Sequence, residues 1–595
     1  MRLKGLNPTW DLDVFFPGGS GSPAFATYLE DLEKDVARFQ AEVTGPTTAS
    51  GVARWVQRLN LLQDLALRLR QAAAFVSCLN AQDVKDHQAR LLGGRVKQIQ
   101  ARYASALSFM DQALLQIPAD QWQEILSSPE LQPLAFNLEE RRRRAQEKMA
   151  PELESLANDL AVDGYHGWSE LYDAVVGRMT IPVPEDGKVV LVSPAQASNR
   201  MISPDPKVRQ QVMLNWEQAW SDVADLCASA LNHLAGFRLN LYHHRGWESP
   251  LKEPLEINRM SAATLEAMWQ AVNANKDRLV TYLKRKQKAL GLTALGWQDV
   301  NAPLGQADRK FSYDEAANFI VEQFGRFDLD LAQFAANAFS QRWIEAEDRP
   351  GKRPGGFCTS FPTSRQSRIF LTFSGNLGNL GTLAHELGHA YHQHVMADLP
   401  ALAQQYAMNV AETASTFAEL IVSNAAIAQA QDPQERLFLI DDKLSGATGL
   451  LMNIQARFLF ETRFYEARKK GPLSVTALNE LMVEAQKEAY REALDLYHPH
   501  FWASKLHFYI TNTPFYNFPY TFGFLFSNGV YARAREEGPA FAKKYVELLR
   551  DTGRMRVEDL AWKHLAADLT RSDFWEQAIL TALADLDEFL RLTES

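Results

Sequence analysis

The sequence predicts a mainly α-helical protein with small β elements. Long segments such as Trp55–Phe75 and Arg141–Val162 place apolar residues three and four positions apart, the spacing of an amphipathic helix. Runs of β-prone residues are few and short. The chain has 595 residues, 46% of them hydrophobic, which is enough apolar material for a large core and for more than one domain-sized unit.

The N-terminal part is predicted to consist of long helices that end at a β-hairpin. A loop rich in Pro, Gly and Ser at Phe16–Pro23 precedes the helical pattern, which continues to about Gly177. Two β-prone runs, Arg178–Val183 and Lys188–Val192, flank the turn-forming sequence Pro-Glu-Asp-Gly. We therefore expect a hairpin near residues 178–192, an N-terminal helical region over residues 1–200, and a second, mostly helical region over residues 201–595.

A small β element interrupts the second region. Helical patterning begins at about Ser203 and stops at Asp348–Pro362, an irregular stretch rich in Pro and Gly. The run SRIFLTF at Ser367–Phe373 is β-like, and a glycine-spaced loop then leads into a helix that we expect to begin near Thr382. The remaining sequence is again mostly helical in pattern.

The charge balance argues against nucleic-acid binding. The chain contains 62 Lys and Arg against 72 Asp and Glu, a formal charge of −10, so it lacks a general attraction for phosphate backbones or anionic lipid. The one dense cationic cluster is Arg141–Arg144. Glu139, Glu140 and Glu147 can pair with it at helical spacing, so we expect a solvated helix face there.

Cysteine usage and apolar run lengths favour a cytoplasmic protein with no membrane partner. Cys78, Cys227 and Cys358 are far apart and form no CxxC pair, so neither a disulfide framework nor a thiolate metal site is indicated. Charged residues interrupt every apolar run before it reaches about 18 residues. The first residues, MRLKGLNPTWDLDVFF, contain no continuous apolar stretch of the kind found in signal peptides.

The sequence His385-Glu386-Leu387-Gly388-His389 carries the strongest chemical signal. Residues four apart on an α-helix project from nearly the same face, so the two imidazoles can bind one metal ion. Glu386 lies where its carboxylate can reach a metal-bound water without being a ligand, which suits a general base. The spacing therefore predicts the two-histidine half of a catalytic zinc site.

A third protein ligand is expected from a later element. The arrangement HExxHxxGxxH is excluded, because His392 and Val395 stand where that pattern needs Gly and His. The best candidate segment is YAMNVAETASTFAELIVSNAA, which is helix-like and carries Glu412 and Glu419 seven positions apart, on one face. Either carboxylate could be the ligand.

Two further histidines on the same helix receive structural interpretations. His392 is two turns beyond His385, about 10 Å along the axis, so the two cannot share a metal ion. We expect His392 to be a core residue or to support a ligand from behind. His394 has no predicted role.

An aromatic segment near the C-terminus, HFYITNTPFYNFPYTFGFLFSNG, is the third chemical signal. Most of its Phe residues are expected in the core. The polar groups of His507, Tyr516 and Tyr520 need partners, and Pro514, Pro519 and Gly523 predict a shaped, non-helical loop. Phenol and imidazole donors of this kind suit stabilisation of a tetrahedral oxyanion.

These segments resemble the M3 family of zinc metallopeptidases, and more closely its oligoendopeptidase F branch. Four segments resemble family signatures in family order: GKRPGGFCTSFP at Gly351–Pro362, TLAHELGHAYH at Thr382–His392, NVAETASTFAE at Asn409–Glu419, and HFYITNTPFYNFPYTFGFLF at His507–Phe526. The stretch from ERRRR to DAVVG also resembles the N-terminal helical region of that branch.

The resemblance implies a two-lobed helical metallopeptidase that encloses a deep channel, admits short unstructured peptides and excludes folded proteins. It implies one zinc ion per chain, with the catalytic domain in residues 201–595 and the small β element beside the HExxH helix. The implied zinc ligands are His385, His389 and Glu412, which decides between the two glutamates, and the implied base is Glu386.

The family's transition-state donors correspond to His507, Tyr516 and Tyr520, whereas Phe524 replaces a further Tyr of many relatives. The loop Gly355-Gly356-Phe357 and the strand at Ile369–Phe373 are expected beside the substrate backbone. An exposed strand edge there would bind an extended peptide through main-chain hydrogen bonds.

The predicted activity is zinc-dependent cleavage of internal bonds in short peptides. Two alternatives stay open at this point. The first is a metallocarboxypeptidase of similar helical build, which needs a cation to bind the terminal carboxylate of the substrate. The second is a catalytically silent peptide-binding protein, against which the intact Glu386 argues. The ligand types favour zinc, although two histidines and one carboxylate can hold several divalent ions.

Overall fold

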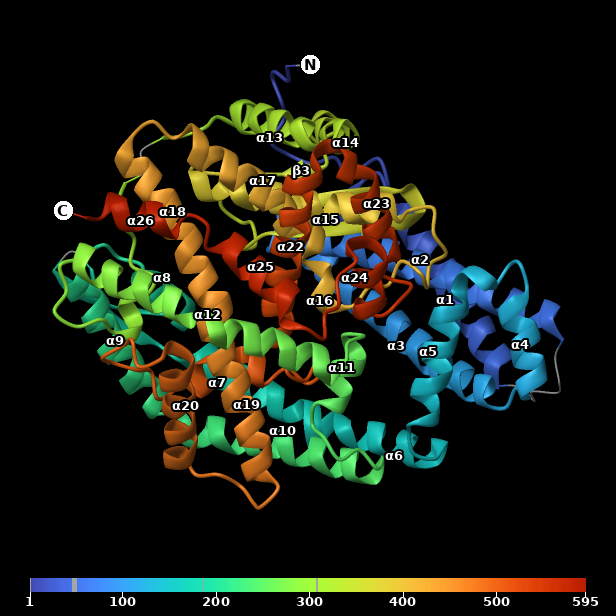
Figure 1. Ribbon diagram of the computed structural model, residues 1–595. Coiled ribbons are helices and arrows are strands. Elements are labelled where there is room, and N and C mark those ends of the chain that lie inside the picture. The colour runs from blue at the N-terminus through green and yellow to red at the C-terminus, as the bar shows by residue number, and fades with distance from the viewer. Residues whose placement is uncertain (1, 45–50, 186, 307–308, 595) are drawn as a thin grey trace. The chain divides into compact units, whose positions relative to one another are not determined.

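The computed structural model describes residues 2–44, 51–185, 187–306 and 309–594 and is mainly α-helical (Figure 1). The chain forms two compact units, each assembled from three stretches of sequence. The first unit comprises Met1–Lys148, Asp308–Ala425 and Arg533–Ala566, and the second comprises Met149–Ala307, Ala426–Ala532 and Ala567–Ser595. The units are thus interleaved along the chain, whereas the expected boundary near residue 200 divides it into consecutive regions and stays a prediction.

The first unit consists of helices around one three-stranded sheet. Its helices are α1 (Pro23–Thr44), α2 (Val52–Gln82), α3 (His87–Leu115), α4 (Ala119–Ser127), α5 (Ala135–Gln146), α13 (Tyr313–Phe327), α14 (Leu329–Ser340), α15 (Leu377–Val395), α16 (Met408–Ala411), α23 (Phe541–Asp551) and α24 (Val557–Leu565). Two more helices, α17 (Thr413–Gln429) and α22 (Phe518–Glu537), run across the boundaries between the stretches of the two units.

The second unit contains helices and one hairpin. Its helices are α6 (Pro151–Ala161), α7 (Gly167–Arg178), α8 (Pro194–Arg200), α9 (Pro206–Ser221), α10 (Ala224–His244), α11 (Lys252–Ile257), α12 (Ala262–Ala289), α18 (Pro433–Thr448), α19 (Ile454–Arg468), α20 (Val475–Tyr490), α21 (Phe501–Ser504), α25 (Ser572–Ala582) and α26 (Leu586–Leu592). β1 (Ile181–Glu185) and β2 (Lys188–Val192) pair antiparallel, where the sequence predicts a hairpin.

Apolar periodicity explains the core of the first unit. α1 buries Phe25, Leu29, Leu32, Val36 and Phe39, which recur every three or four residues along one face. This face packs against α3 and α2. None of the described helices has the length and apolarity needed to cross a lipid bilayer.

The helix predicted over Arg141–Val162 is wrong as a single element. α5 ends at Gln146 and α6 begins at Pro151. Proline is favoured in the first turn of a helix and disfavoured in its interior, so Pro151 marks a new start. The arginine cluster on α5 is half-buried and paired: Arg144 lies 2.9 Å from Glu140, and Arg141 lies 2.7 Å from Asp111.

The small sheet lies directly before the predicted metal-binding helix. β4 (Phe357–Phe361) pairs antiparallel with β5 (Gln366–Phe370), and β5 pairs parallel with β3 (Ile344–Glu345). The order β3-β5-β4 makes β5 central. The strand at Ile369–Phe373 therefore does not offer a free edge, because its N–H groups donate to the segment that contains β3; the edge strand on the predicted substrate side is β4.

Candidate metal centre

α15 carries His385, Glu386 and His389 and begins five residues before the expected start at Thr382. Its first residue is Leu377, because the side chain of Asn376 accepts a hydrogen bond from the Asn379 N–H and caps the helix. Leu377–Gly381 of the glycine-spaced segment therefore belong to the helix, and only Ser374–Asn376 precede it.

His385, His389 and Glu412 form one group. Oε2 of Glu412 lies 3.2 Å from Nε2 of His385 and 3.5 Å from Nε2 of His389. One ligand atom from each of the three residues lies within 4.8 Å of the others. Two imidazole nitrogens and one carboxylate oxygen at this spacing match the protein ligands of a divalent metal site that keeps one position open.

Glu412 reaches this position because the predicted continuous helix is interrupted. α16 ends at Ala411 and α17 begins at Thr413, so Glu412 lies at the junction between them. Oγ of Ser415 donates to Oε2 of Glu412 at 2.8 Å and holds the carboxylate in place. The direction of the Glu412 side chain is therefore set by the junction between the two helices and not by the spacing of residues along one helix.

Glu419 supports the site from behind. Its Oε2 lies 3.0 Å from Nδ1 of His385, on the ring nitrogen opposite the one that faces Glu412. A carboxylate on the far nitrogen fixes the orientation of a ligand histidine and raises its basicity. Of the two glutamates left open by spacing, Glu412 faces both imidazoles and Glu419 contacts one from outside.

The charges of these groups are strongly coupled. Burial disfavours a charged imidazole, but hydrogen bonds to Glu412 and Glu419 outweigh it and raise the pKa of His385 to about 10. Burial likewise opposes ionisation of Glu412, yet its contacts with His385 and His389 hold the pKa of its carboxyl well below its usual range. The contacts thus favour a positive charge on His385 beside an ionised Glu412.

Glu386 is buried and poorly satisfied. Its side chain is 7% exposed, and Oε2 has no hydrogen-bond partner among the described residues. Burial raises the pKa of Glu386 and so makes its carboxylate a stronger base. A buried acceptor without a partner is costly in a folded protein, which is the expected condition of a group that waits for a ligand or a proton.

The chemistry of the donor set fits a divalent metal ion. The two imidazoles converge on a carboxylate, and Glu419 fixes the orientation of one of them. Next to His385 in sequence, Glu386 has a carboxylate oxygen, Oε2, without a partner among the described residues. His385, His389 and Glu412 would hold the ion, while Glu386 stays outside the ligand group.

Close helix packing explains why residue 388 is glycine. A Cβ atom at Gly388 would lie 2.4 Å from the carbonyl oxygen of Ala414 and 2.6 Å from Cα of Ser415. Both atoms belong to the backbone at the start of α17, next to Glu412. The close approach of α15 and α17 places Glu412 opposite the two histidines.

Replacing Gly388 with Ala is expected to destabilise the protein by about 3 kcal/mol and to weaken metal binding, because α17 must move away from α15. Thermal unfolding and metal titration measure the two effects. Gly94→Ala is the matched control: a Cβ at Gly94, inside α3, meets no atom within 4 Å, and alanine there should stabilise the helix slightly. Equal effects of the two substitutions would contradict the packing argument.

The segment Gly355-Gly356-Phe357 lies beside Glu386. A Cβ at Gly356 would lie 3.4 Å from Oε1 of Glu386, and Gly355 has a φ of +92° that favours glycine. The Phe357 ring stacks on Phe370 with centroids 5.3 Å apart. The segment is thus close to the general-base candidate, and its contact with substrate stays a prediction.

Arg70 of α2 fixes the sheet against α15. Its Nη2 donates to Oγ of Ser360 in β4 at 3.0 Å and to Oε1 of Gln393 in α15 at 2.9 Å. This contact between three distant parts of the sequence holds the edge strand next to the metal-binding helix.

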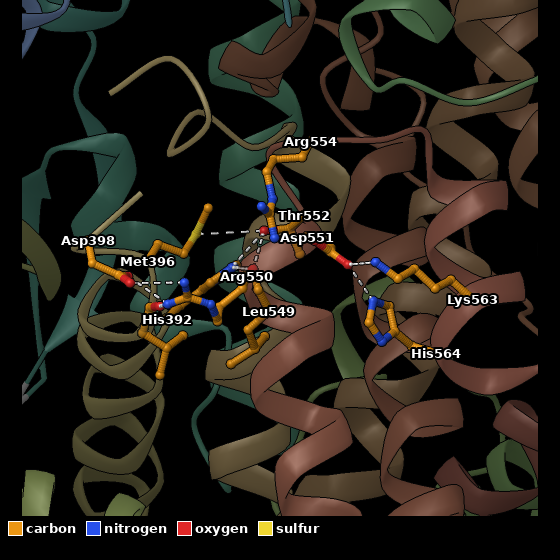
Figure 2. Close-up of polar contacts among 11 residues, drawn as sticks. His392, Met396, Asp398, Leu549, Arg550, Asp551, Thr552, Arg554, Lys563 and His564 are labelled. Carbon is orange, nitrogen blue, oxygen red and sulfur yellow. Dashed lines mark hydrogen bonds and ion pairs between the residues drawn. The ribbon is translucent and has the colours of Figure 1, made fainter. Parts of the chain in front are cut away.

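His392 is a core residue, as predicted. Its side chain is 0% exposed, and Nε2 lies 2.9 Å from Oγ1 of Thr552 and 3.2 Å from the carbonyl oxygen of Leu549 (Figure 2). Nδ1 has no partner among the described residues, and the ring stacks on Tyr406. The contacts connect α15 to α23, and burial lowers the pKa of His392 to about 3.

The stability of the fold should therefore decrease as the pH falls, because the folded protein keeps His392 unprotonated. The folded protein keeps this imidazole neutral down to about pH 3, whereas the unfolded chain takes up its proton near pH 6.5. The contribution of neutral His392 to the free energy of unfolding is fully present above pH 6.5 and declines by about 1.4 kcal/mol per pH unit below it. Comparison of melting temperatures from pH 7 to pH 4 should show a shallower decline for His392→Gln. A decline as steep as that of the wild type would contradict this assignment.

The structure places His507, Tyr516 and Tyr520 together in the second unit. The ring centroids of His507 and Tyr516 are 4.9 Å apart, and the Tyr520 hydroxyl donates to that of Tyr516 at 3.1 Å. The prediction of a wholly non-helical segment is wrong, because α22 begins at Phe518 and includes Tyr520. Pro519 falls in the first turn of that helix, where it needs no N–H donor.

Sequence reasoning missed two residues that contact His507, Asn517 and Arg457, and a third, Lys505, whose charge affects it. Oδ1 of Asn517 lies 2.8 Å from Nδ1 of His507 and accepts a hydrogen bond from Nη1 of Arg457 at 2.9 Å. Burial lowers the pKa of His507 to about 4, and the charges of Arg457 and Lys505 add to this effect. Nothing local in the sequence marks Arg457 as a neighbour of a histidine fifty residues away.

A helical fold that brings an HExxH helix against a third carboxylate defines a metallopeptidase type of site. Comparison with known families agrees: the sequence model of Peptidase family M3 matches residues 200–580, and that of Oligopeptidase F matches residues 114–181. The chain belongs to peptidase family M3, in its oligopeptidase F branch, and is a metallopeptidase of that family.

Individual relatives extend over most of the chain. It is 27% identical over 531 residues to the group B oligopeptidase PepB of Streptococcus agalactiae, covering 87% of this chain and 86% of the relative. It is 21% identical to the oligopeptidase PepF of Bacillus subtilis, covering 98% and 87%. The crystal structure of oligoendopeptidase-F from Enterococcus faecium shares the fold, with a TM-score of 0.72 at 19% identity and coverage of 96% and 99%.

Proposed function

We propose that the chain is a zinc-dependent endopeptidase that cleaves internal bonds of short, unstructured peptides. The observation that carries the proposal is the convergence of His385, His389 and Glu412 next to a buried Glu386 whose Oε2 has no partner among the described residues. Membership of the oligopeptidase F branch and the similarity to oligopeptidases PepB and PepF support oligopeptides as substrates.

The chain's own residues supply positioning and proton transfer. His385, His389 and Glu412 would hold a zinc ion, which would supply Lewis-acid polarisation of the scissile carbonyl and a lowered pKa for a bound water. Glu386 takes the proton of the attacking water, because burial has raised its basicity, and delivers a proton to the leaving amine. Glu419 keeps His385 oriented throughout.

His507, Tyr516 and Tyr520 are proposed to stabilise the oxyanion. Phenol hydroxyls donate hydrogen bonds to a developing negative charge, and the Tyr520 hydroxyl already donates to that of Tyr516. Gly355, Gly356 and Phe357, at the start of the edge strand β4, are proposed to bind the substrate main chain. The proposed setting is the cytoplasm, with neither nucleic acid nor membrane as a partner.

Mass spectrometry of a mixed-length peptide pool tests the proposal. Purified protein is compared as isolated, stripped by a chelator, and restored with zinc. Internal cuts in short peptides that vanish on stripping and return with zinc are the expected result. Stepwise trimming from the C-terminus would identify a carboxypeptidase instead, and tight binding without cleavage in metal-replete protein would identify a peptide-binding protein.

A further inference from the structure

Two cations of the second unit, Arg457 and Lys505, flank one aromatic ring. The guanidinium carbon of Arg457 and Nζ of Lys505 each lie 5.2 Å from the ring centroid of Phe501. Arg457 comes from α19, and Lys505 follows α21 directly. Two like charges on one ring repel each other, so their proximity needs a compensating interaction.

Neither cation has a carboxylate partner among the described residues. Arg457 donates from Nε to Asn453 and from Nη1 to Asn517, and its Nη2 makes no hydrogen bond with the described residues. Nζ of Lys505 makes neither a hydrogen bond nor an ion pair with them. Both side chains are half-buried, and an anionic partner stabilises a positive charge that is partly removed from water.

Two carboxylates of the second unit make contacts elsewhere. Glu461 is one helical turn beyond Arg457 on α19, but its Oε1 accepts from the N–H of Phe515. Glu217 contacts Nδ1 of both His498 and His500, the histidines just before α21. Within the described part of the chain, no carboxylate contacts Arg457 or Lys505.

The electrostatics agree with this geometry. Burial lowers the pKa of Lys505 to about 8, and the charge of Arg457 contributes to the shift. Burial also lowers the pKa of Arg457 to about 10. An anion that contacts both groups would relieve both effects and would accept charge-assisted hydrogen bonds from a guanidinium and an ammonium.

The cations adjoin the proposed oxyanion donors. Nη1 of Arg457 lies 3.2 Å from Nδ1 of His507, and the His507 ring lies 4.9 Å from that of Tyr516. A peptide that meets these donors therefore passes close to Arg457 and Lys505. The planar guanidinium matches a carboxylate, which is the anion that peptides carry.

We propose that Arg457 and Lys505 form a subsite that binds a carboxylate of the peptide substrate beside His507. The identity of the ligand as a peptide rests on the proposed function. The carboxylate is either the C-terminus of the peptide or an Asp or Glu side chain near the cleaved bond. In both cases the subsite favours peptides with a negative charge at a fixed place, and so sets specificity.

The test measures binding separately from cleavage. Isothermal titration calorimetry is done on metal-replete Glu386→Gln protein with two peptide pairs, and mass spectrometry confirms that the recovered peptides are intact. One pair is an alanine-rich hexapeptide with a free C-terminus and its C-terminal amide. The other is an amidated hexapeptide with an internal Glu and its Gln counterpart.

We expect the charged member of one pair to bind about tenfold or more tightly than its neutral counterpart. A preference in the first pair identifies the C-terminus, and a preference in the second identifies a side chain. In a Lys505→Met background the ratio should approach one, and Lys505→Arg should retain the preference. Lys470→Met, at an exposed lysine of the same unit, is the control and should leave the ratio unchanged.

Equal binding of both members in both pairs would overturn the subsite, as would a preference that survives Lys505→Met. These outcomes are distinct from failure of the proposed function. A wild-type protein that cleaves charged and neutral peptides equally well is a peptidase without this subsite. A protein that cleaves nothing, yet binds the charged peptide through Lys505, has the subsite without the activity.

Discussion

Glu386→Gln is expected to lower peptide turnover by about three orders of magnitude or more while the metal stays bound. Glutamine has the same shape as glutamate but cannot accept the proton of the attacking water. Glu386 is not one of the three grouped ligands, so metal content should be that of the wild type. Turnover of a short peptide and metal analysis of the same sample measure the two quantities.

The fold should tolerate this change. Oε2 of Glu386 has no hydrogen-bond partner among the described residues, so the substitution breaks no hydrogen bond of this atom with them and removes a buried charge. The melting temperature should therefore be unchanged or slightly higher. Glu322→Gln, at an exposed helical glutamate of the first unit paired with Arg326, is the matched control and should keep full activity. Near-normal turnover by metal-replete Glu386→Gln protein would refute the role of Glu386 as base.

Local pattern predicts much of the fold, and the errors have local causes. The apolar spacing of α2 and the turn-forming sequence before β2 predict their elements correctly. The error at Pro151 arose because apolar periodicity continues across a break that only the proline marks. The early start of α15 depends on the Asn376 cap, which a glycine-rich segment conceals.

The metal site is predictable to the extent that it is local. His385 and His389 are four residues apart on one helix, so their spacing alone brings them together. Glu412 is different, because its direction depends on a helix junction and on the approach of α17 at Gly388. Spacing therefore left Glu412 and Glu419 equivalent, and family resemblance was needed to choose between them.

The cation pair shows a third kind of limit. The sequence contains Arg457 and Lys505 among many other charged residues, and Glu461 lies one helical turn from Arg457. The hydrogen bond from the Phe515 N–H to Oε1 of Glu461 exists only in the packed structure. An unpaired charge can be recognised only when all of its neighbours are known.

His389→Ala is expected to remove the metal and, with it, peptide hydrolysis. The substitution deletes one of three ligands and leaves His385 and Glu412, whose contact of 3.2 Å can then persist as an ion pair without metal. Two ligands bind a divalent ion far more weakly than three, so metal content after dialysis should fall from about one per chain to near zero. Metal content and peptide turnover should fall together in His389→Ala, whereas in Glu386→Gln only turnover should fall.

Two further variants give this prediction a graded scale. Glu419→Gln keeps all three ligands and alters only the partner of Nδ1 of His385, so metal affinity should fall by about 10- to 100-fold without being abolished. His394→Ala removes an exposed histidine of the same helix that packs on Phe334 and should bind metal like the wild type. Retention of stoichiometric metal by His389→Ala, or its loss in His394→Ala, would contradict the ligand assignment, because the imidazole that α15 directs at Glu412 would then not be the one that holds the ion.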